Sequence, residues 1–71
     1  MQAASLFSDR RLKTDIRRIG TTDAGLGVYT YRYKGGETVH MGVMADEVAE
    51  ILPDAVGEAH GFNTVNYEAI A

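Results

Sequence analysis

The 71-residue sequence contains no cysteine and only two histidines, His40 and His60. Disulfide frameworks and thiolate metal sites are therefore excluded, and two imidazoles are too few for a typical structural zinc site. No apolar run is long enough to cross a bilayer. We accordingly expect no bound metal, no cofactor and no membrane partner.

Positive charge is also scarce, because seven Lys and Arg stand against ten Asp and Glu and the net charge is −3. An acidic balance of this kind argues against nucleic acid as a partner. Most of the basic residues nevertheless gather near the N-terminus, at Arg10, Arg11, Lys13, Arg17 and Arg18. For this cluster we favour a solvated basic face over a phosphate-binding patch.

The short chain limits the size of the core. A protein of this length buries only about 60% of the surface that its unfolded form exposes. The apolar fraction of 45% is ordinary for a globular domain, and the sequence holds no internal repeat, low-complexity tract or linker. The sequence therefore predicts one small domain whose stability is marginal without a partner.

Two hairpins can be predicted from alternating and turn-forming residues. Residues 28–33 are rich in β-branched and aromatic side chains, and residues 38–44 alternate apolar with other residues after a glycine-containing turn. A second pair of strands, residues 55–58 and 62–67, flanks the turn 59–61, in which His60 would lie.

The helical patterns are shorter. Between Ala45 and Leu52 the spacing of Val48, Ile51 and Leu52 predicts a helix that Pro53 ends, with a core that Met41 and Met44 also fill. Residues 10–19 are ambiguous. Leu12, Ile16 and Ile19 have the spacing of a short helix, whereas Leu12, Thr14 and Ile16 alternate as they would in a strand. The expected fold is α+β: a small single domain with two β-hairpins packed on one or two short helices.

Ser8 and Lys13 are the residues with the clearest potential for chemistry, because a neutral lysine can activate a serine nucleophile. Five positions apart, they would lie about 140° apart on a helix and on opposite faces of a strand. They can meet only if Ser8 lies in a loop that turns back over the next element. The alternative is that Ser8 or Asp9 caps a helix while Lys13 is solvated.

A catalytic Lys13 would need a pKa lowered from about 10.4 towards 7 or 8. Burial or the neighbouring Arg10 and Arg11 would lower it, whereas Asp9 would raise it. His40 could act as a second base, but a strand histidine more often has no such role. Three tyrosines on one strand face are expected in the core or in a subunit contact, namely Tyr29, Tyr31 and Tyr33.

The segment from Ser8 to Lys13 resembles the opening motif of the S74 peptidase family. This is the intramolecular chaperone and auto-processing domain at the C-termini of phage tailspikes and tail fibres. Further blocks follow in the family's order up to about Ile70, at 29–34, 40–45, Glu47, Val48, Pro53, Val56, Gly61 and 65–67.

The resemblance implies a self-cleaving serine endopeptidase that acts once. Ser8 would be the nucleophile, Lys13 the general base, and Asp9 a residue that orients the loop or caps the next element. The cut would fall between Phe7 and Ser8, and backbone amides near Ser8 are the expected oxyanion donors.

The resemblance also implies an organisation and a setting. Residues 1–7 would be a leader or the end of a parent chain, and residues 8–71 the chaperone domain. Its partners would be itself, as a homotrimer, and the upstream segment of a phage or prophage tail fibre, in the virion tail fibre or in the host cytoplasm during assembly. The alternative function is a non-cleaving trimerisation or capping interaction domain of the same fold.

Overall fold

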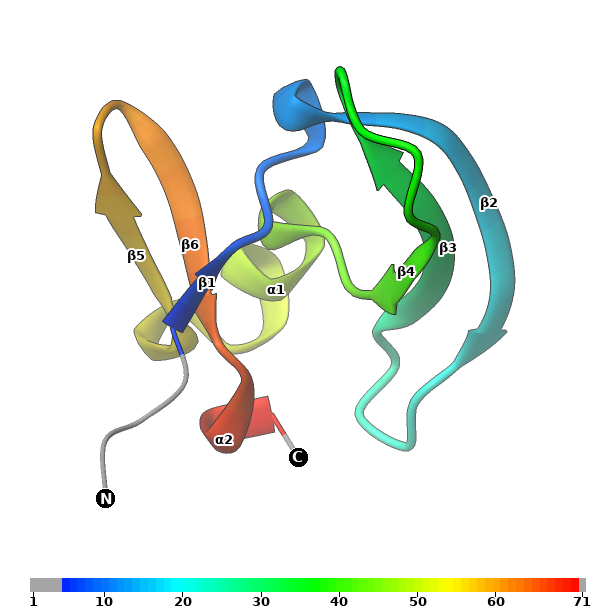
Figure 1. The fold of residues 1–71 in the computed structure, drawn as a ribbon. Helices are drawn as coiled ribbons and strands as arrows, with labels where there is room; N and C mark the ends of the chain where they lie inside the picture. Colours follow the sequence, from blue (N-terminus) through cyan, green and yellow to red (C-terminus); the bar gives the residue numbers. More distant parts are fainter. Residues whose placement is uncertain (1–4, 71) are drawn as a thin grey trace.

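Two antiparallel sheets form the framework of the computed structural model, which describes residues 5–70 (Figure 1). The first sheet has the order β1–β6–β5, with β1 at Ser5–Phe7, β6 at Phe62–Asn66 and β5 at Val56–Ala59. The second has the order β2–β3–β4, with β2 at Lys13–Thr21, β3 at Gly27–Tyr33 and β4 at His40–Gly42. The helices are α1, Ala45–Ile51, and α2, Tyr67–Ile70.

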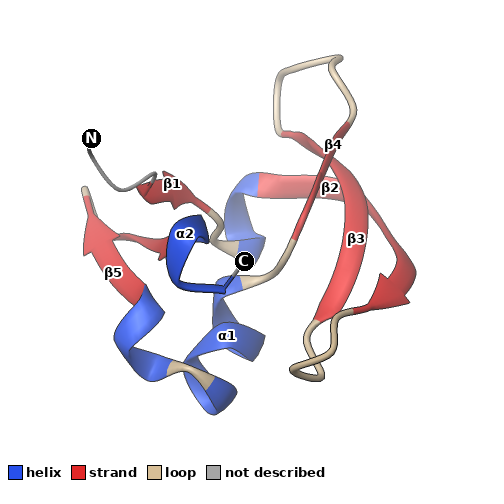
Figure 2. Cartoon of the chain, turned by 90° about the horizontal axis from the view of Figure 1, so that it is seen from below, coloured by secondary structure: helices blue, strands red, loops and turns tan. Residues whose placement is uncertain are grey.

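The α+β fold class is confirmed. In the view from below, α1 lies between the two sheets (Figure 2). Both predicted hairpins are present, because β3 pairs with β4 and β5 pairs with β6, each in antiparallel register. The expected leader, residues 1–7, is only partly described: residues 5–7 form β1 and pair with β6, whereas residues 1–4 lie outside the described residues.

Two residues form the turn of the second hairpin, between β5 and β6. His60 and Gly61 both have positive φ, 55° and 81°. Two consecutive residues in this region make the tight turn that matches the right-handed twist of paired strands. The prediction that His60 lies in a turn is therefore confirmed.

The helical interpretation of residues 10–19 is wrong. Only Arg10–Leu12 forms a 3₁₀ turn, and the strand β2 begins at Lys13. Asp15 has a φ of 54°, and the pairing with β3 shifts between Thr14 and Arg17, as expected for a β-bulge. The apolar spacing resembled a helix because the bulge interrupts the alternation, and Ile19 is exposed.

The core consists of two groups of buried side chains. The first, here called the aliphatic cluster, packs around α1 and contains Leu26, Val43, Ala45, Val48, Ala55 and Val65. The second, here called the tyrosine cluster, contains Tyr29, Tyr31 and Met44, with Ile16 and Tyr33 packed against it. The burial predicted for Val48 and Met44 is confirmed.

Two residues expected in the core lie outside it. Ile51 is 44% exposed and Met41 is 69% exposed. Val48 faces inward from the middle of the seven-residue helix, whereas Ile51 is its last residue. Met41 belongs to a strand of only three residues, in which Gly42 is the buried one.

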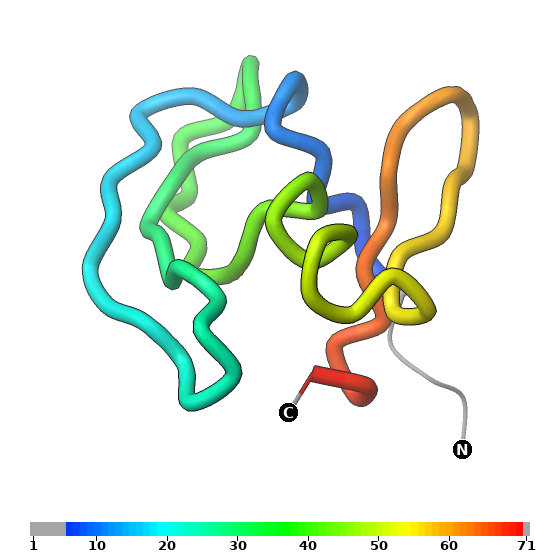
Figure 3. Tube along the Cα trace, turned by 180° about the vertical axis from the view of Figure 1, so that it is seen from behind, coloured from blue at the N-terminus to red at the C-terminus, as the bar shows by residue number. Residues whose placement is uncertain are grey.

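Residues 8–12 carry the chain from the first sheet to the second (Figure 3). They connect β1 to β2, and each of these two strands lies at an edge of its sheet. Within residues 5–70, none of the helices is long and apolar enough to cross a membrane. The same residues contain no group of three or more potential metal-ligating side chains.

Candidate active site

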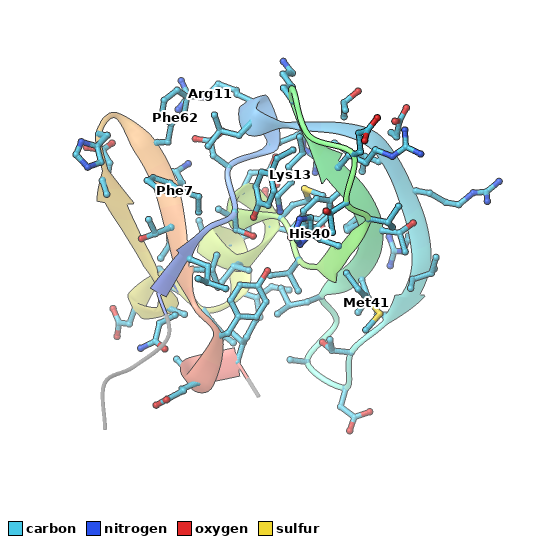
Figure 4. All side chains as sticks on the ribbon, in the orientation of Figure 1. Phe7, Arg11, Lys13, His40, Met41 and Phe62 are labelled. Carbon is cyan, nitrogen blue, oxygen red and sulfur yellow. The ribbon has the colours of Figure 1, made fainter. Side chains whose placement is uncertain are left out.

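Ser8 and Lys13 meet in the crossing between the two sheets. Ser8 directly follows β1, Lys13 is the first residue of β2, and the 3₁₀ turn Arg10–Leu12 lies between them. The Lys13 Nζ atom donates a hydrogen bond of 3.0 Å to Ser8 Oγ. Ser8 is fully buried and Lys13 is 3% exposed, and Figure 4 shows Lys13 between the sheets. The pair therefore adopts the loop arrangement that its spacing required.

Every polar group of Ser8 has a partner. Its N–H donates to the Asn63 carbonyl at 3.1 Å, and its carbonyl accepts from the Ala45 N–H at 2.9 Å. Its hydroxyl donates to the Val43 carbonyl at 2.7 Å. Strand β6 and the first turn of α1 thus hold the serine backbone, which fixes the position of Oγ.

Lys13 is a buried amine whose charge is disfavoured by its burial. Its Nζ atom donates to the Val43 carbonyl at 2.9 Å and lies 3.8 Å from the centre of the Tyr31 ring. Burial, assisted by the charge of Arg10, lowers the pKa of Lys13 from its ordinary value of 10.5 to about 8, although Asp46 and Asp9 act in the opposite direction. A substantial fraction of this lysine is therefore neutral near pH 8, and it does not belong to a solvated basic face.

Asp9 organises the loop between the two residues. Its carboxylate accepts the Arg11 backbone N–H at 2.9 Å and so caps the 3₁₀ turn. It also accepts the Arg11 guanidinium at 2.7 Å and the Asn63 N–H at 3.0 Å. Hydrogen bonds from Arg11 hold the pKa of Asp9 well below its usual range despite the burial of the carboxylate. Asp9 thereby ties the turn to β6.

The peptide bond between Phe7 and Ser8 is held from both sheets. Its N–H points to Asn63 in β6, as described above, and the carbonyl of a trans peptide points the opposite way. The Phe7 carbonyl oxygen accepts a hydrogen bond of 2.7 Å from the Tyr33 hydroxyl in β3. The sequence pattern marked Tyr33 as part of an aromatic strand face but did not indicate this contact.

Tyr67 and Gly42 complete the surroundings of Ser8, and the sequence reasoning assigned them no role. The Tyr67 hydroxyl accepts the Val43 N–H at 3.2 Å and lies 3.1 Å from Ser8 Oγ, so its proton is free to point at Ser8. A Cβ on Gly42 would lie only 2.5 Å from this hydroxyl. Glycine at this position therefore makes room for the tyrosine.

His40 lies on β4 and is exposed. Its ring stacks on Tyr31 at 5.9 Å between ring centres and meets Tyr33 edge-on at 5.0 Å. His40 therefore packs with Tyr31 and Tyr33, and we call these three rings the aromatic wall. It is not held as a base against Ser8, which agrees with the expectation that a strand histidine has no such role. An apolar pocket of about 470 Å³ opens beside this wall and is lined by Leu6, Phe7, Leu12, Tyr33, Lys34 and His40.

Comparison with models of known protein families gives a match. A family model for Peptidase S74, described as chaperone of endosialidase, matches residues 8–57, which is more than half of the chain. The match begins at the buried serine described above and includes Lys13. Neither the curated proteins nor the solved structures contain a match to the chain.

Proposed function

Because this chain belongs to the Peptidase S74 family, described as chaperone of endosialidase, we propose that it is the C-terminal intramolecular chaperone domain of a phage or prophage tail fibre. In this proposal residues 8–71 are the domain, and the upstream chain is the parent that it helps to assemble as a trimer. The domain then releases itself by cutting the bond between Phe7 and Ser8.

The observation that carries the self-cleavage is the buried contact of 3.0 Å between Lys13 Nζ and Ser8 Oγ. With Lys13 protonated, the Ser8 hydroxyl keeps its own proton and donates it in a hydrogen bond to the Val43 carbonyl. When Lys13 is neutral, its lone pair can accept that proton as Oγ forms a bond to the Phe7 carbonyl carbon. Loss of the proton from Lys13 is thus the step that activates the serine.

The reaction conserves atoms and charge in two stages. In the first stage, Ser8 Oγ bonds to the Phe7 carbonyl carbon, and the carbonyl π electrons move onto the oxygen of a tetrahedral intermediate. When these electrons form the carbonyl again, the bond between the Phe7 carbon and the Ser8 nitrogen breaks. The departing amine takes up the proton that Lys13 accepted, which leaves an ester between the Phe7 acyl group and Ser8 Oγ. Water then hydrolyses the ester and gives a carboxylate at Phe7, a free Ser8 hydroxyl and one proton, which the new Ser8 amine takes up.

The fold supports a cut that waits for folding. Ser8 is positioned by β6 and α1, whereas Lys13 is buried against Tyr31 of β3. An unfolded chain holds neither residue in place and leaves the lysine at its ordinary pKa. Cleavage would therefore follow the folding of the domain, as a chaperone that releases a finished client requires.

Trimer assembly is supported by the apolar surface of a very small domain. A 71-residue chain has a marginal core, and subunit contacts are a common way to stabilise one. Among the residues whose burial the structure describes, six large apolar side chains are exposed, namely Leu6, Phe7, Ile19, Val39, Met41 and Ile51. Sedimentation of the chain at several concentrations tests this part, and a monomer at all of them contradicts it.

The self-cleavage is tested with a folded reporter protein attached before Met1. We expect mass spectrometry to show a cut between Phe7 and Ser8, and an intact chain for Ser8→Ala and for Lys13→Ala. Lys34→Ala, which removes the exposed second lysine, is the matched control and should be cut normally. Cleavage of Ser8→Ala at the same bond contradicts the mechanism, whereas an intact parent chain favours the non-cleaving interaction domain.

A further inference from the structure

The Phe7 carbonyl oxygen is the atom on which negative charge would form during the proposed cleavage, and it already accepts a hydrogen bond of 2.7 Å from Tyr33. We propose that the Tyr33 hydroxyl is the oxyanion donor of this site. The inference rests on the proposed function, because it assigns Tyr33 a part in the same reaction. It replaces the backbone amides near Ser8 that the sequence suggested.

Two of the backbone amides closest to Ser8 are engaged elsewhere. The Ser8 N–H donates to the Asn63 carbonyl on the opposite side of the scissile peptide, and the Ala45 N–H donates to the Ser8 carbonyl. By contrast, the Tyr33 hydroxyl points at the reacting oxygen at the usual O–H···O distance. A donor that is in place before charge develops stabilises the transition state without reorganisation.

The strand pairing explains why base and donor are found together. Lys13 and Tyr33 are direct partners in the antiparallel pair β2–β3, and side chains opposite each other in such a pair share one face. The Tyr33 ring meets Tyr31 edge-on, with ring centres 5.4 Å apart and planes at 83°. Together with His40, this contact fixes the direction of the hydroxyl.

The test compares single-hydroxyl deletions in the full chain with the upstream reporter. Tyr33→Phe keeps the ring contacts, and we expect its maximal cleavage rate to fall about 100-fold. The pH at which the rate is half-maximal should stay where it is in the parent, because the lysine is unchanged. The matched control is Tyr29→Phe, which removes the hydroxyl that donates to Glu47 from the same strand and should be cut at the parent's rate.

A second replacement keeps the test decisive if Tyr33→Phe folds poorly. A fluorinated tyrosine at position 33 keeps the hydroxyl and makes it more acidic, so the donated hydrogen bond strengthens. We expect this chain to be cut at least as fast as the parent at pH values where its phenol is still protonated. A slower cut there contradicts the assignment.

The outcomes separate this inference from the function on which it rests. If Tyr33→Phe is cut at the parent's maximal rate while Ser8→Ala stays intact, Tyr33 is not the donor but the self-cleavage stands. If Tyr33→Phe shifts the half-maximal pH and leaves the maximal rate unchanged, Tyr33 acts through Lys13 and the assignment is wrong. A parent chain that is never cut contradicts both proposals.

Discussion

The aliphatic cluster and the tyrosine cluster divide the small core by chemistry. The aliphatic cluster holds only apolar side chains and packs α1 against β6 and β5. In the tyrosine cluster, the ring of Tyr31 lies against the buried Lys13, and the hydroxyls of Tyr29 and Tyr33 donate to Glu47 and to the Phe7 carbonyl. One cluster therefore stabilises the fold, while the other borders the Ser8–Lys13 site through Tyr31 and Tyr33.

The two clusters join at residues 42–45. Val43 packs in the aliphatic cluster, but its carbonyl accepts hydrogen bonds from both Ser8 and Lys13. Met44, the next residue, packs in the tyrosine cluster. Damage to the packing of α1 should therefore reach the site, whereas changes inside the site need not weaken the fold.

The largest expected effect is a gain in stability from Lys13→Met. A pKa near 8 in place of 10.5 corresponds to roughly 3 kcal/mol of unfavourable burial at pH 7, since tenfold is about 1.4 kcal/mol. Ser8 still satisfies the Val43 carbonyl in this variant. We expect the free energy of unfolding in urea at pH 7 to rise by up to about 3 kcal/mol and cleavage to stop.

The stability that Lys13→Met gains over the parent should depend on pH and be largest at low pH. Above pH 10.5 the lysine is neutral in both states, and as the pH falls the unfolded chain takes up the proton first. The parent therefore loses stability between about pH 10.5 and pH 8, and its stability stays lower by a constant amount below pH 8. The advantage of Lys13→Met should vanish near pH 11, and an advantage that stays constant from pH 7 to pH 11 would contradict this argument.

A loss of stability is expected from the other cluster. Val48 is fully buried, so Val48→Ala should lower the free energy of unfolding by about 2 kcal/mol. Ile51→Ala should cost less than half as much, because this side chain is 44% exposed. Cleavage measured against urea should fail at a lower concentration in Val48→Ala. Equal losses in the two variants would contradict the assignment of the core.

Gly42→Ala tests the junction between the clusters. The added methyl group would lie 2.5 Å from the Tyr67 hydroxyl and 3.1 Å from that of Tyr31, so one of these side chains must move. We expect a cost of about 1–2 kcal/mol in unfolding experiments and slower cleavage. Gly20→Ala is the control, because a Cβ there has no neighbour within 4 Å; similar behaviour of the two variants would exclude crowding as the cause.

The smallest effect is expected from Arg10→Gln. The parent's cleavage rate should reach half of its maximum near pH 8, where Lys13 loses its proton. Removing the Arg10 charge should move this midpoint slightly upwards. Its ion pair with Asp46 is exposed, so stability should change by less than about 0.5 kcal/mol. A downward shift in the rate profile would contradict the electrostatic argument.

Local patterns in the sequence predicted the elements whose signals are local. The two hairpins and α1 follow from alternation, turn residues and a helical repeat, all within short windows. The residues of β2 were misread because the bulge at Asp15 breaks the alternation and pairing with β3 outweighs the helical spacing. Ile51 was wrongly expected in the core. A helical repeat shows which face of a helix is apolar, but it does not show how far along the helix other elements bury that face.

The site divides in the same way. Because Ser8 and Lys13 are only five residues apart, the sequence showed that they could meet if Ser8 lay in a loop. The partners that complete the site come from far along the chain: Tyr33 lies 26 residues from Phe7, and Tyr67 lies 59 residues from Ser8. Such contacts depend on how the two sheets approach each other, which no short window of sequence contains.

Strand β1 has only three residues and pairs with one edge of β6, whose other edge is covered by β5. In the proposed reaction, a cut after Phe7 would turn these residues into the end of a separate chain, held to β6 only by the hydrogen bonds of this strand pairing. Their departure opens one side of β6 and uncovers a backbone that can accept another extended segment. If the proposed cut occurs, the severed parent end would compete with any other extended segment for this edge of β6.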